Sequence, residues 1–284
     1  MPTVEEHQAA LDRVPANFDG ERAELDGLPV FWRSAPSAGL PTLYLHGAPT
    51  NADDWTPFLA LGGGLAPDLP GFGRSGKPNG FDYSFAGYGR FVERFLDMVG
   101  VDRLNLLVHG LGAVGLAFAQ RFPDRIGRLA VVDAVPLLPG YEWSRLAATW
   151  RRPLVGEVAM GAMTDRVVRR VSRDVNVHPL PEEHLRSVLD HFDYGTQRAI
   201  IKLLRTLPPE ALAAAGADLG EIDAPALVVW GERDPYFPSS FAAGYADALG
   251  GETELLVLPD AGHYPWLDRP DLVEQVVGFF EAGS

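Results

Sequence analysis

The chain has 284 residues, of which 46% are hydrophobic and 22% charged, and its formal net charge is −14. This composition excludes a disordered chain and predicts a sizeable apolar core. The acidic balance argues against nucleic acids and anionic membranes as partners, because both carry negative charge.

Cysteine is absent, which excludes a disulfide framework, a thiolate nucleophile and a thiolate metal site. Residues 1–18 are acidic and contain no apolar run, so we expect no signal peptide. No stretch approaches the roughly 18 uninterrupted apolar residues of a membrane span. These features predict a cytoplasmic protein without a membrane segment.

The first predicted elements are two strands joined by a tight turn. Asp26-Gly27 separates two alternating stretches within residues 21–33, which is typical of a β-hairpin. A short apolar strand follows at 41–47, and another short apolar segment at 61–66 leads into the Gly/Pro-rich loop DLPGFGRSGKP.

A helix is predicted over 85–99, where apolar residues recur at helical spacing, and Gly100 suits its C-terminal end. The stretch LNLLVHG predicts a buried strand that turns sharply into a helix, LGAVGLAFAQRF, and RLAVVD predicts another strand. Continuous apolar strands that alternate with helices are typical of a parallel sheet covered on both faces.

Residues 136–219 follow a different pattern, because helical stretches succeed one another there without a clear strand. We interpret this region as a helical cap inserted into a core formed by residues 1–135 and 220–284. APALVVWG resumes the sheet, ETELLVLP is its last strand, and DLVEQVVGFFEAG is a closing helix. The expected fold class is α/β, with a mostly parallel sheet, helices on both faces and an inserted cap.

Four loops at predicted strand ends carry candidate functional residues, because ligands gather at the carboxyl ends of parallel strands. The first loop begins His46-Gly47-Ala48. Its glycine lets backbone N–H groups point at a developing oxyanion, although a plain turn explains the sequence equally well.

The second loop, VHGLGA, lies where a nucleophile elbow would be expected. Gly112 and Ala113 supply the small neighbours that such a turn requires. The residue at its apex is Gly110, which has no side chain and cannot attack a substrate.

The last two loops carry Asp234, in GERDP, and His263, after the final strand. An aspartate before proline is often only a turn residue, and a lone loop histidine is more often inert. The order of elbow, acid and histidine, each after a strand, favours a carboxylate–histidine pair.

Together these pieces resemble the α/β-hydrolase superfamily over nearly the whole chain. The matching motifs are HGAPTNADDW, DLPGFGRSGKP, VHGLGA, GERDPYFP and AGHYPWLDRP. Within the superfamily the resemblance leans toward haloalkane dehalogenases and epoxide hydrolases, on the HGAPT motif followed by Trp55 and on Val-His before the elbow. It implies hydrolysis through a covalent ester, and its GERDP context favours Asp234 over Asp133 as the acid.

The chain departs from this family pattern at the site itself. The family requires Asp or Ser where Gly110 stands. Dehalogenases carry an Asn or a similar donor where Ala48 stands and a Trp where Leu111 stands, so halide binding is not expected. The backbone N–H groups of Ala48 and Leu111 are the expected oxyanion donors.

Gly110 leaves three interpretations open. The chain is an inactivated hydrolase, or an enzyme in which His263 and Asp234 activate water or drive a lyase or isomerase reaction by proton transfer. Alternatively it is a non-catalytic binding protein that retains the pair because breaking it would leave a buried charge unpaired. We favour a hydrolase of small or medium apolar substrates that contain an ester, an epoxide or a similar electrophilic carbon.

Further residues are expected to contact such a small-molecule substrate, and the cap aromatics are expected to line an apolar pocket or to pack the cap. His178, His184 and His191 are not at a spacing typical of a metal site, and we expect no metal and no cofactor. The sequence does not indicate an oligomeric state. The expected substrate contacts are His46, Trp55, His109, Tyr141, Trp143 and Tyr194.

Overall fold

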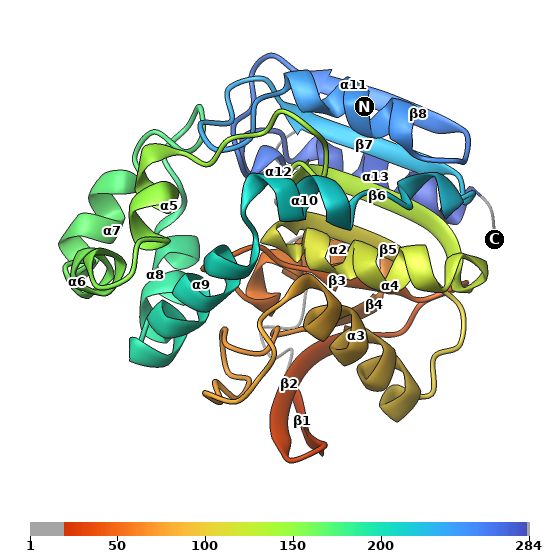
Figure 1. The fold of residues 1–284 in the computed structure, drawn as a ribbon. Coiled ribbons are helices and arrows are strands. Elements are labelled where there is room, and N and C mark those ends of the chain that lie inside the picture. The colour runs from red at the N-terminus through yellow and green to blue at the C-terminus, as the bar shows by residue number, and fades with distance from the viewer. Residues whose placement is uncertain (1–19, 283–284) are drawn as a thin grey trace.

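A mixed sheet runs through the centre of the protein, seen in a computed structural model that describes residues 20–282 (Figure 1). The strand order is β1-β2-β4-β3-β5-β6-β7-β8. The pairs β1–β2 and β2–β4 are antiparallel, and the remaining pairs are parallel, which confirms the predicted α/β class. The strands are β1 (Glu21–Leu25), β2 (Leu28–Ala35), β3 (Thr42–Leu45), β4 (Gly64–Pro67), β5 (Leu104–Gly110), β6 (Ile126–Ala134), β7 (Ala226–Gly231) and β8 (Thr253–Leu258).

The predicted hairpin opens the sheet. Asp26 and Gly27 have φ values of 52° and 80°, and Leu25 faces Leu28 across the turn. A two-residue turn with positive φ at both central positions matches the right-handed twist of the strands it joins. The hairpin prediction is therefore confirmed.

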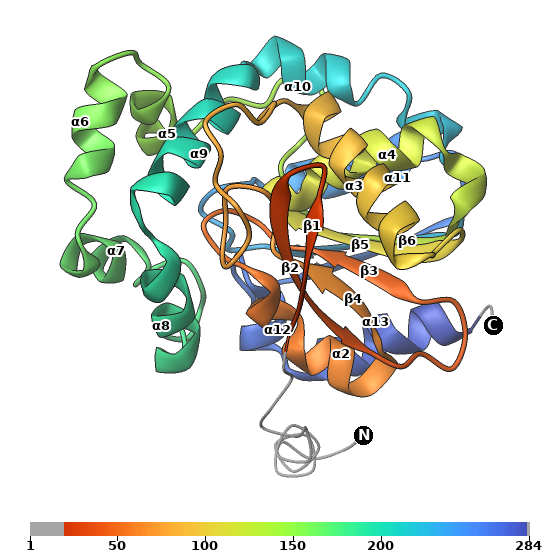
Figure 2. The ribbon, with the colours of Figure 1, turned by 90° about the horizontal axis from the view of Figure 1, so that it is seen from below.

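Helices cover both faces of the sheet, with α3, α4 and α11 on one face and α2, α12 and α13 on the other (Figure 2). The helix predicted over 85–99 is α3, where the Ser84 hydroxyl accepts from the Gly87 N–H and Gly100 ends the helix at a φ of 73°. The helices on the two faces are α2 (Thr56–Gly62), α3 (Phe85–Val99), α4 (Leu116–Arg121), α11 (Ser240–Ala248), α12 (Pro265–Asp268) and α13 (Asp271–Glu281).

Apolar side chains pack in one cluster on each side of the sheet. Alternate residues of β5 serve the two clusters: Leu106 and Val108 belong to one and Leu107 to the other. This alternation explains why the strand is continuously apolar in sequence.

Between β6 and β7 the chain forms helices, and we call residues 136–219 the helical insertion. Figures 1 and 2 show α5 to α9 as a group beside the sheet, whereas α10 lies back along the core. The Gln120 side chain of α4 donates to the Ala215 carbonyl of α10 at 2.9 Å, which ties α10 to the core. The helices of the insertion are α5 (Arg145–Trp150), α6 (Val155–Gly161), α7 (Asp165–Val171), α8 (Glu182–His191), α9 (Tyr194–Thr206) and α10 (Pro209–Ala215).

Two local predictions differ from the structure. Residues 61–66, expected as one apolar segment, are the end of α2 and the start of β4. Gly63 separates them at a φ of 67°, and a Cβ there would lie 2.1 Å from the Pro36 carbonyl oxygen, so the helix ends at this point. The helix expected directly after the elbow begins as a 3-10 turn, η2 (Leu111–Gly115), before α4.

Across the part of the chain that the structure describes, no helix combines the length and apolar character of a membrane span.

Candidate active site

The strand-to-helix turn at the end of β5 brings two loops into contact. Gly110 has a φ of 55°, and a Cβ built on it would lie 3.2 Å from the Gly47 Cα and 3.7 Å from Nε2 of His263. A Cβ on Gly112 would lie 2.3 Å from the Leu45 carbonyl oxygen, so the turn requires small residues there. A side chain at position 110 would therefore project toward the His263 imidazole.

His263 is held by a carboxylate on the side of its ring that faces away from Gly110. Its Nδ1 lies 2.8 Å from Oδ2 of Asp234, and the side chains are only 6% and 0% exposed. The other oxygen, Oδ1, accepts from the backbone N–H groups of Tyr236 and Phe237 at 2.7 and 3.1 Å. These bonds fix the carboxylate, which in turn fixes the imidazole with Nε2 toward position 110.

The alternative acid, Asp133, lies beside Asp234 but not against the imidazole. It is the penultimate residue of β6, with a φ of 38°, and both of its carboxyl oxygens accept from the Gly231 N–H, at 2.9 and 3.2 Å. Burial and the neighbouring Asp234 charge hold the pKa of Asp133 well above its ordinary value. A carboxyl whose protonated form is favoured therefore lies next to the carboxylate that holds His263.

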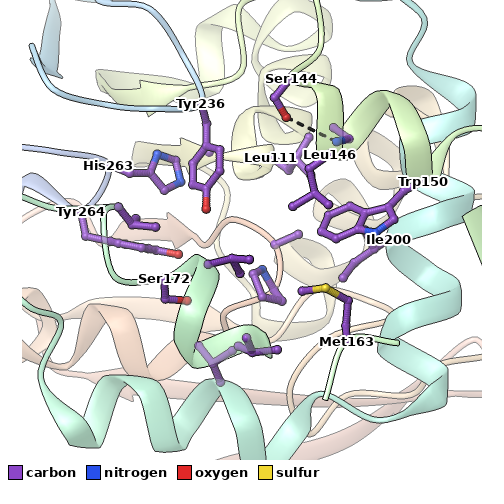
Figure 3. A pocket seen from close by; sticks show the side chains of 18 of the residues that line it. Leu111, Ser144, Leu146, Trp150, Met163, Ser172, Ile200, Tyr236, His263 and Tyr264 are labelled. Atoms are coloured by element: carbon purple, nitrogen blue, oxygen red, sulfur yellow. Dashed lines mark hydrogen bonds between the residues drawn. The ribbon is translucent and has the colours of Figure 1, made fainter. Parts of the chain in front are cut away.

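A cavity of about 140 Å³ lies in front of His263, between the core and the helical insertion. Figure 3 shows His263, Tyr236 and Tyr264 on one side of it, and Trp150 and Met163 on the other. Its lining is mostly apolar. Of the residues predicted from sequence, it includes Ala48, Gly110, Leu111, Tyr141, Trp143 and His263.

Tyr194 was expected to contact substrate, and this prediction is wrong. The residue begins α9, its side chain is 83% exposed, and it does not line the cavity. Its position on the outer face of a helix explains the difference, because a tyrosine in a helical region can point to solvent as easily as inward.

Three further predicted contacts, His46, Trp55 and His109, are buried beneath the cavity and do not line it, which corrects those predictions. His46 accepts through Nε2 from the Leu69 N–H at 2.9 Å. His109 places Nε2 2.8 Å from the His263 carbonyl oxygen, and their rings lie 4.6 Å apart between centroids. These side chains pack against the site from within the core.

His184 lines the cavity although the sequence did not indicate it, and Trp150 is one of the cap aromatics that were expected to line an apolar pocket or to pack the cap. His184 comes from α8, and its Nδ1 lies 3.4 Å from Oδ1 of Asp54 in the 3-10 turn η1 (Ala52–Trp55). Trp150 comes from α5. No local motif in either helix distinguishes these positions from packing residues.

A metal site is not formed by the residues described: no group of three or more histidine, aspartate or glutamate side chains is arranged to hold an ion among them.

Comparison with known proteins relates this fold and site to a family. The model of the alpha/beta hydrolase family matches residues 43–276. A haloalkane dehalogenase of Bradyrhizobium diazoefficiens is 28% identical over 95% of this chain and 96% of its own. The crystal structure of the haloalkane dehalogenase DbeA from Bradyrhizobium elkani superposes with a TM-score of 0.79, at 28% identity over 94% of this chain and 99% of the other.

An epoxide hydrolase, CorEH, shares the fold with a TM-score of 0.80 at 21% identity, over 93% of this chain and 98% of the other. The sequence resemblance to the haloalkane dehalogenase branch is thus confirmed. With its eight-stranded sheet, its strand-end loops and a family match across most of its length, the chain belongs to the alpha/beta hydrolase family.

Proposed function

We propose that this protein hydrolyses small apolar substrates by using His263 and Asp234 to activate water directly. One observation carries the proposal. The point at which a Cβ on Gly110 would lie is 3.7 Å from Nε2 of His263, so the place of a family nucleophile is within reach of the imidazole. A water molecule near that point could give its proton to Nε2.

The reaction then needs no covalent intermediate. The water oxygen attacks the electrophilic carbon while its proton passes to Nε2 of His263, and Asp234 stabilises the imidazolium through Nδ1. Ala48 and Leu111 both line the cavity, and their backbone N–H groups are the proposed donors to the oxyanion. General-base catalysis of this kind contributes roughly 10²–10⁴-fold in rate.

The cavity supports a small apolar substrate. Its volume of about 140 Å³ is close to that of cavities that hold a benzene-sized ligand. The side chains of Ala48 and Leu111 offer no hydrogen-bond donor to a departing halide. We therefore favour an ester or an epoxide over a haloalkane, with the helical insertion acting as the cap over the site.

Turnover by the protein and by three variants tests the proposal. The protein, His263→Ala, Gly110→Ser and Gly110→Asp are compared on activated esters, epoxides and haloalkanes, with Tyr194→Phe as a control outside the cavity. We expect turnover by the protein and its loss in His263→Ala. Turnover only after Gly110→Ser or Gly110→Asp would identify an inactivated hydrolase and overturn water activation.

The second candidate is a non-catalytic binding protein, favoured by the missing side chain at position 110. It predicts that esters bind without turnover in every variant. A lyase or isomerase that uses the same histidine predicts proton exchange from substrate carbon into solvent without hydrolysis, which NMR in heavy water would detect.

A further inference from the structure

A second histidine–carboxyl pair joins the helical insertion to the core. His184 lies on α8 and Asp54 in η1, and Nδ1 of the histidine is 3.4 Å from Oδ1 of the aspartate. Their side chains are only 8% and 5% exposed. Next to them, the Ser187 hydroxyl donates to Oδ2 of Asp53 at 2.8 Å, so the same face of α8 is fixed to the same turn.

The remaining polar atoms of this pair lack partners. Within the described residues, neither Nε2 of His184 nor Oδ2 of Asp54 has a hydrogen bond. Buried polar atoms in native proteins are almost always paired, so each exception calls for an explanation such as a ligand. Nε2 is enclosed, but its side chain lines the cavity, so the partner that we infer for it is a substrate group bound there.

The second pair shares its cavity with the first. The ring of Tyr264 contacts both imidazoles, at 4.7 Å from His184 and 4.8 Å from His263 between centroids. One histidine from the core and one from the insertion therefore line the same cavity.

Burial decides which of the two groups holds a proton. It lowers the pKa of His184 to about 4, with the His263 charge acting in the same direction and Asp53 against it. It raises the pKa of Asp54 to about 8, although a hydrogen bond from Thr50 opposes this. At neutral pH the imidazole is neutral and the carboxyl is protonated, so Asp54 can donate to Nδ1 and leave the histidine proton on Nε2.

We propose that His184, positioned by Asp54, is the general acid that protonates an oxygen leaving group in this cavity. The proposal rests on the proposed function and names its substrate class: esters of unactivated alcohols. As the carbon–oxygen bond to the alcohol breaks, the departing oxygen takes the proton from Nε2 of His184. The carboxyl proton of Asp54 moves to Nδ1 at the same time. After the alcohol has left, that proton returns from Nδ1 to Asp54, and the water proton taken by His263 passes through solvent to Nε2 of His184, which restores the starting state.

This assignment separates oxygen from halogen chemistry. A halide departs as a stable anion and requires no proton, whereas an alkoxide is a poor leaving group unless it is protonated as it departs. A proton-donating pair would therefore accelerate the hydrolysis of alcohol esters but not the hydrolysis of haloalkanes.

Two esters with the same acyl group test the pair, one of 4-nitrophenol and one of an aliphatic alcohol. We expect His184→Gln and Asp54→Asn to reduce kcat on the alkyl ester by roughly 10²-fold or more and on the nitrophenyl ester by less than about 5-fold. Ser187→Ala, which removes a neighbouring bond between α8 and the core, is the matched control and should affect both esters equally. Equal losses on both esters in His184→Gln would overturn the proposal.

Two other results would overturn the proposed function itself: His263→Ala retains the rate on the nitrophenyl ester, or neither ester is turned over. If neither ester is turned over, ¹⁵N NMR of His184, assigned with His184→Gln, still tests whether this histidine faces a ligand oxygen. Benzyl alcohol should shift its Nε2 resonance, and toluene, of similar shape, should not. Equal shifts with both probes, or none with either, would show that the histidine does not face a ligand oxygen.

Discussion

His263 and Asp234 come from loops at the ends of neighbouring strands, whereas His184 and Asp54 meet across the contact between the helical insertion and the core. Both oxygens of Asp234 are engaged, by His263 on one side and by backbone N–H groups on the other. Asp54 has one oxygen without a partner. The comparison shows that sheet topology fixes the first pair, while the second depends on how the insertion packs.

The largest effect is expected from Asp234→Asn. The amide keeps the shape of the side chain but no longer stabilises an imidazolium, and it can hold the ring in the wrong tautomer. We expect kcat on the nitrophenyl ester to fall by about 10²–10⁴-fold, because the histidine loses its function as a base. Thermal unfolding of the variant would verify that the fold is retained.

If Asp234→Asn turned over the ester at the rate of the unaltered protein, the first pair would be a structural feature only. The contrast between His263–Asp234 as a pair that supports a base and His184–Asp54 as a pair that donates a proton would then no longer hold.

A large loss of stability is expected from Arg74→Met, because Arg74 fixes the turn that carries Asp54. Its guanidinium contacts Asp68, Asp53 and Asn51 at 2.8, 2.8 and 2.9 Å, and the Asp68 side chain is fully buried. Arg74→Met would leave that carboxylate without its cation, which typically costs about 3 kcal/mol or more.

Urea unfolding would measure the loss in Arg74→Met. Arg94→Met is the matched control, because its partner is the exposed Asp26 and surface ion pairs contribute little. In the folded variant, activity on the alkyl ester should fall more than activity on the nitrophenyl ester. Equal losses would mean that the turn supports both pairs alike.

The same comparison explains what could be predicted from sequence. Gly110 ends β5, and Asp234 and His263 lie in the loops after β7 and β8. A parallel sheet brings the ends of its strands together at one edge, so the order of motifs in the sequence was enough to predict that these residues meet. The hairpin at Asp26 and the end of the helix at Gly100 were predictable from sequence, because the residues of each turn specify its conformation.

Contacts made by the insertion were not predictable in this way. Tyr194 and His184 both lie in helical stretches, yet one side chain is 83% exposed and the other lines the cavity. Which face of a short helix turns inward depends on packing against distant residues, here Asp54, and no local pattern in the sequence records that contact.

The titration of Asp54, which belongs to the second pair only, is expected to have an effect of intermediate size on the free energy of unfolding. In the unfolded chain Asp54 and His184 titrate near 3.8 and 6.5, and in the fold near 8 and 4. Between pH 4 and pH 6.5 the folded and unfolded states each hold one proton on these two groups, so the pair does not make the free energy of unfolding depend on pH. From pH 6.5 to 8 only the folded state keeps its proton, so stability falls as pH rises, by about 2 kcal/mol.

Asp54→Asn should remove that loss, because an asparagine does not titrate. The free energy of unfolding, measured in urea at pH 6.5 and pH 8, should therefore shift in favour of the variant at the higher pH. Groups elsewhere, including Asp53 and His263, are common to both proteins and cancel in the difference. Ser187→Ala should follow the unaltered protein at both values, and parallel behaviour of Asp54→Asn would contradict the raised pKa.

The smallest effect is expected at Asp133, although it lies beside the relay acid and is fully buried. Burial and the Asp234 charge hold its pKa well above the ordinary value, which favours the protonated, uncharged form. Asp133→Asn keeps an uncharged, hydrogen-bonding side chain next to Asp234, and kcat on the nitrophenyl ester should change by less than about 10-fold. A loss as large as that of Asp234→Asn would instead mean that the two carboxyls act as one unit, with the negative charge that stabilises His263 shared between the ends of β6 and β7.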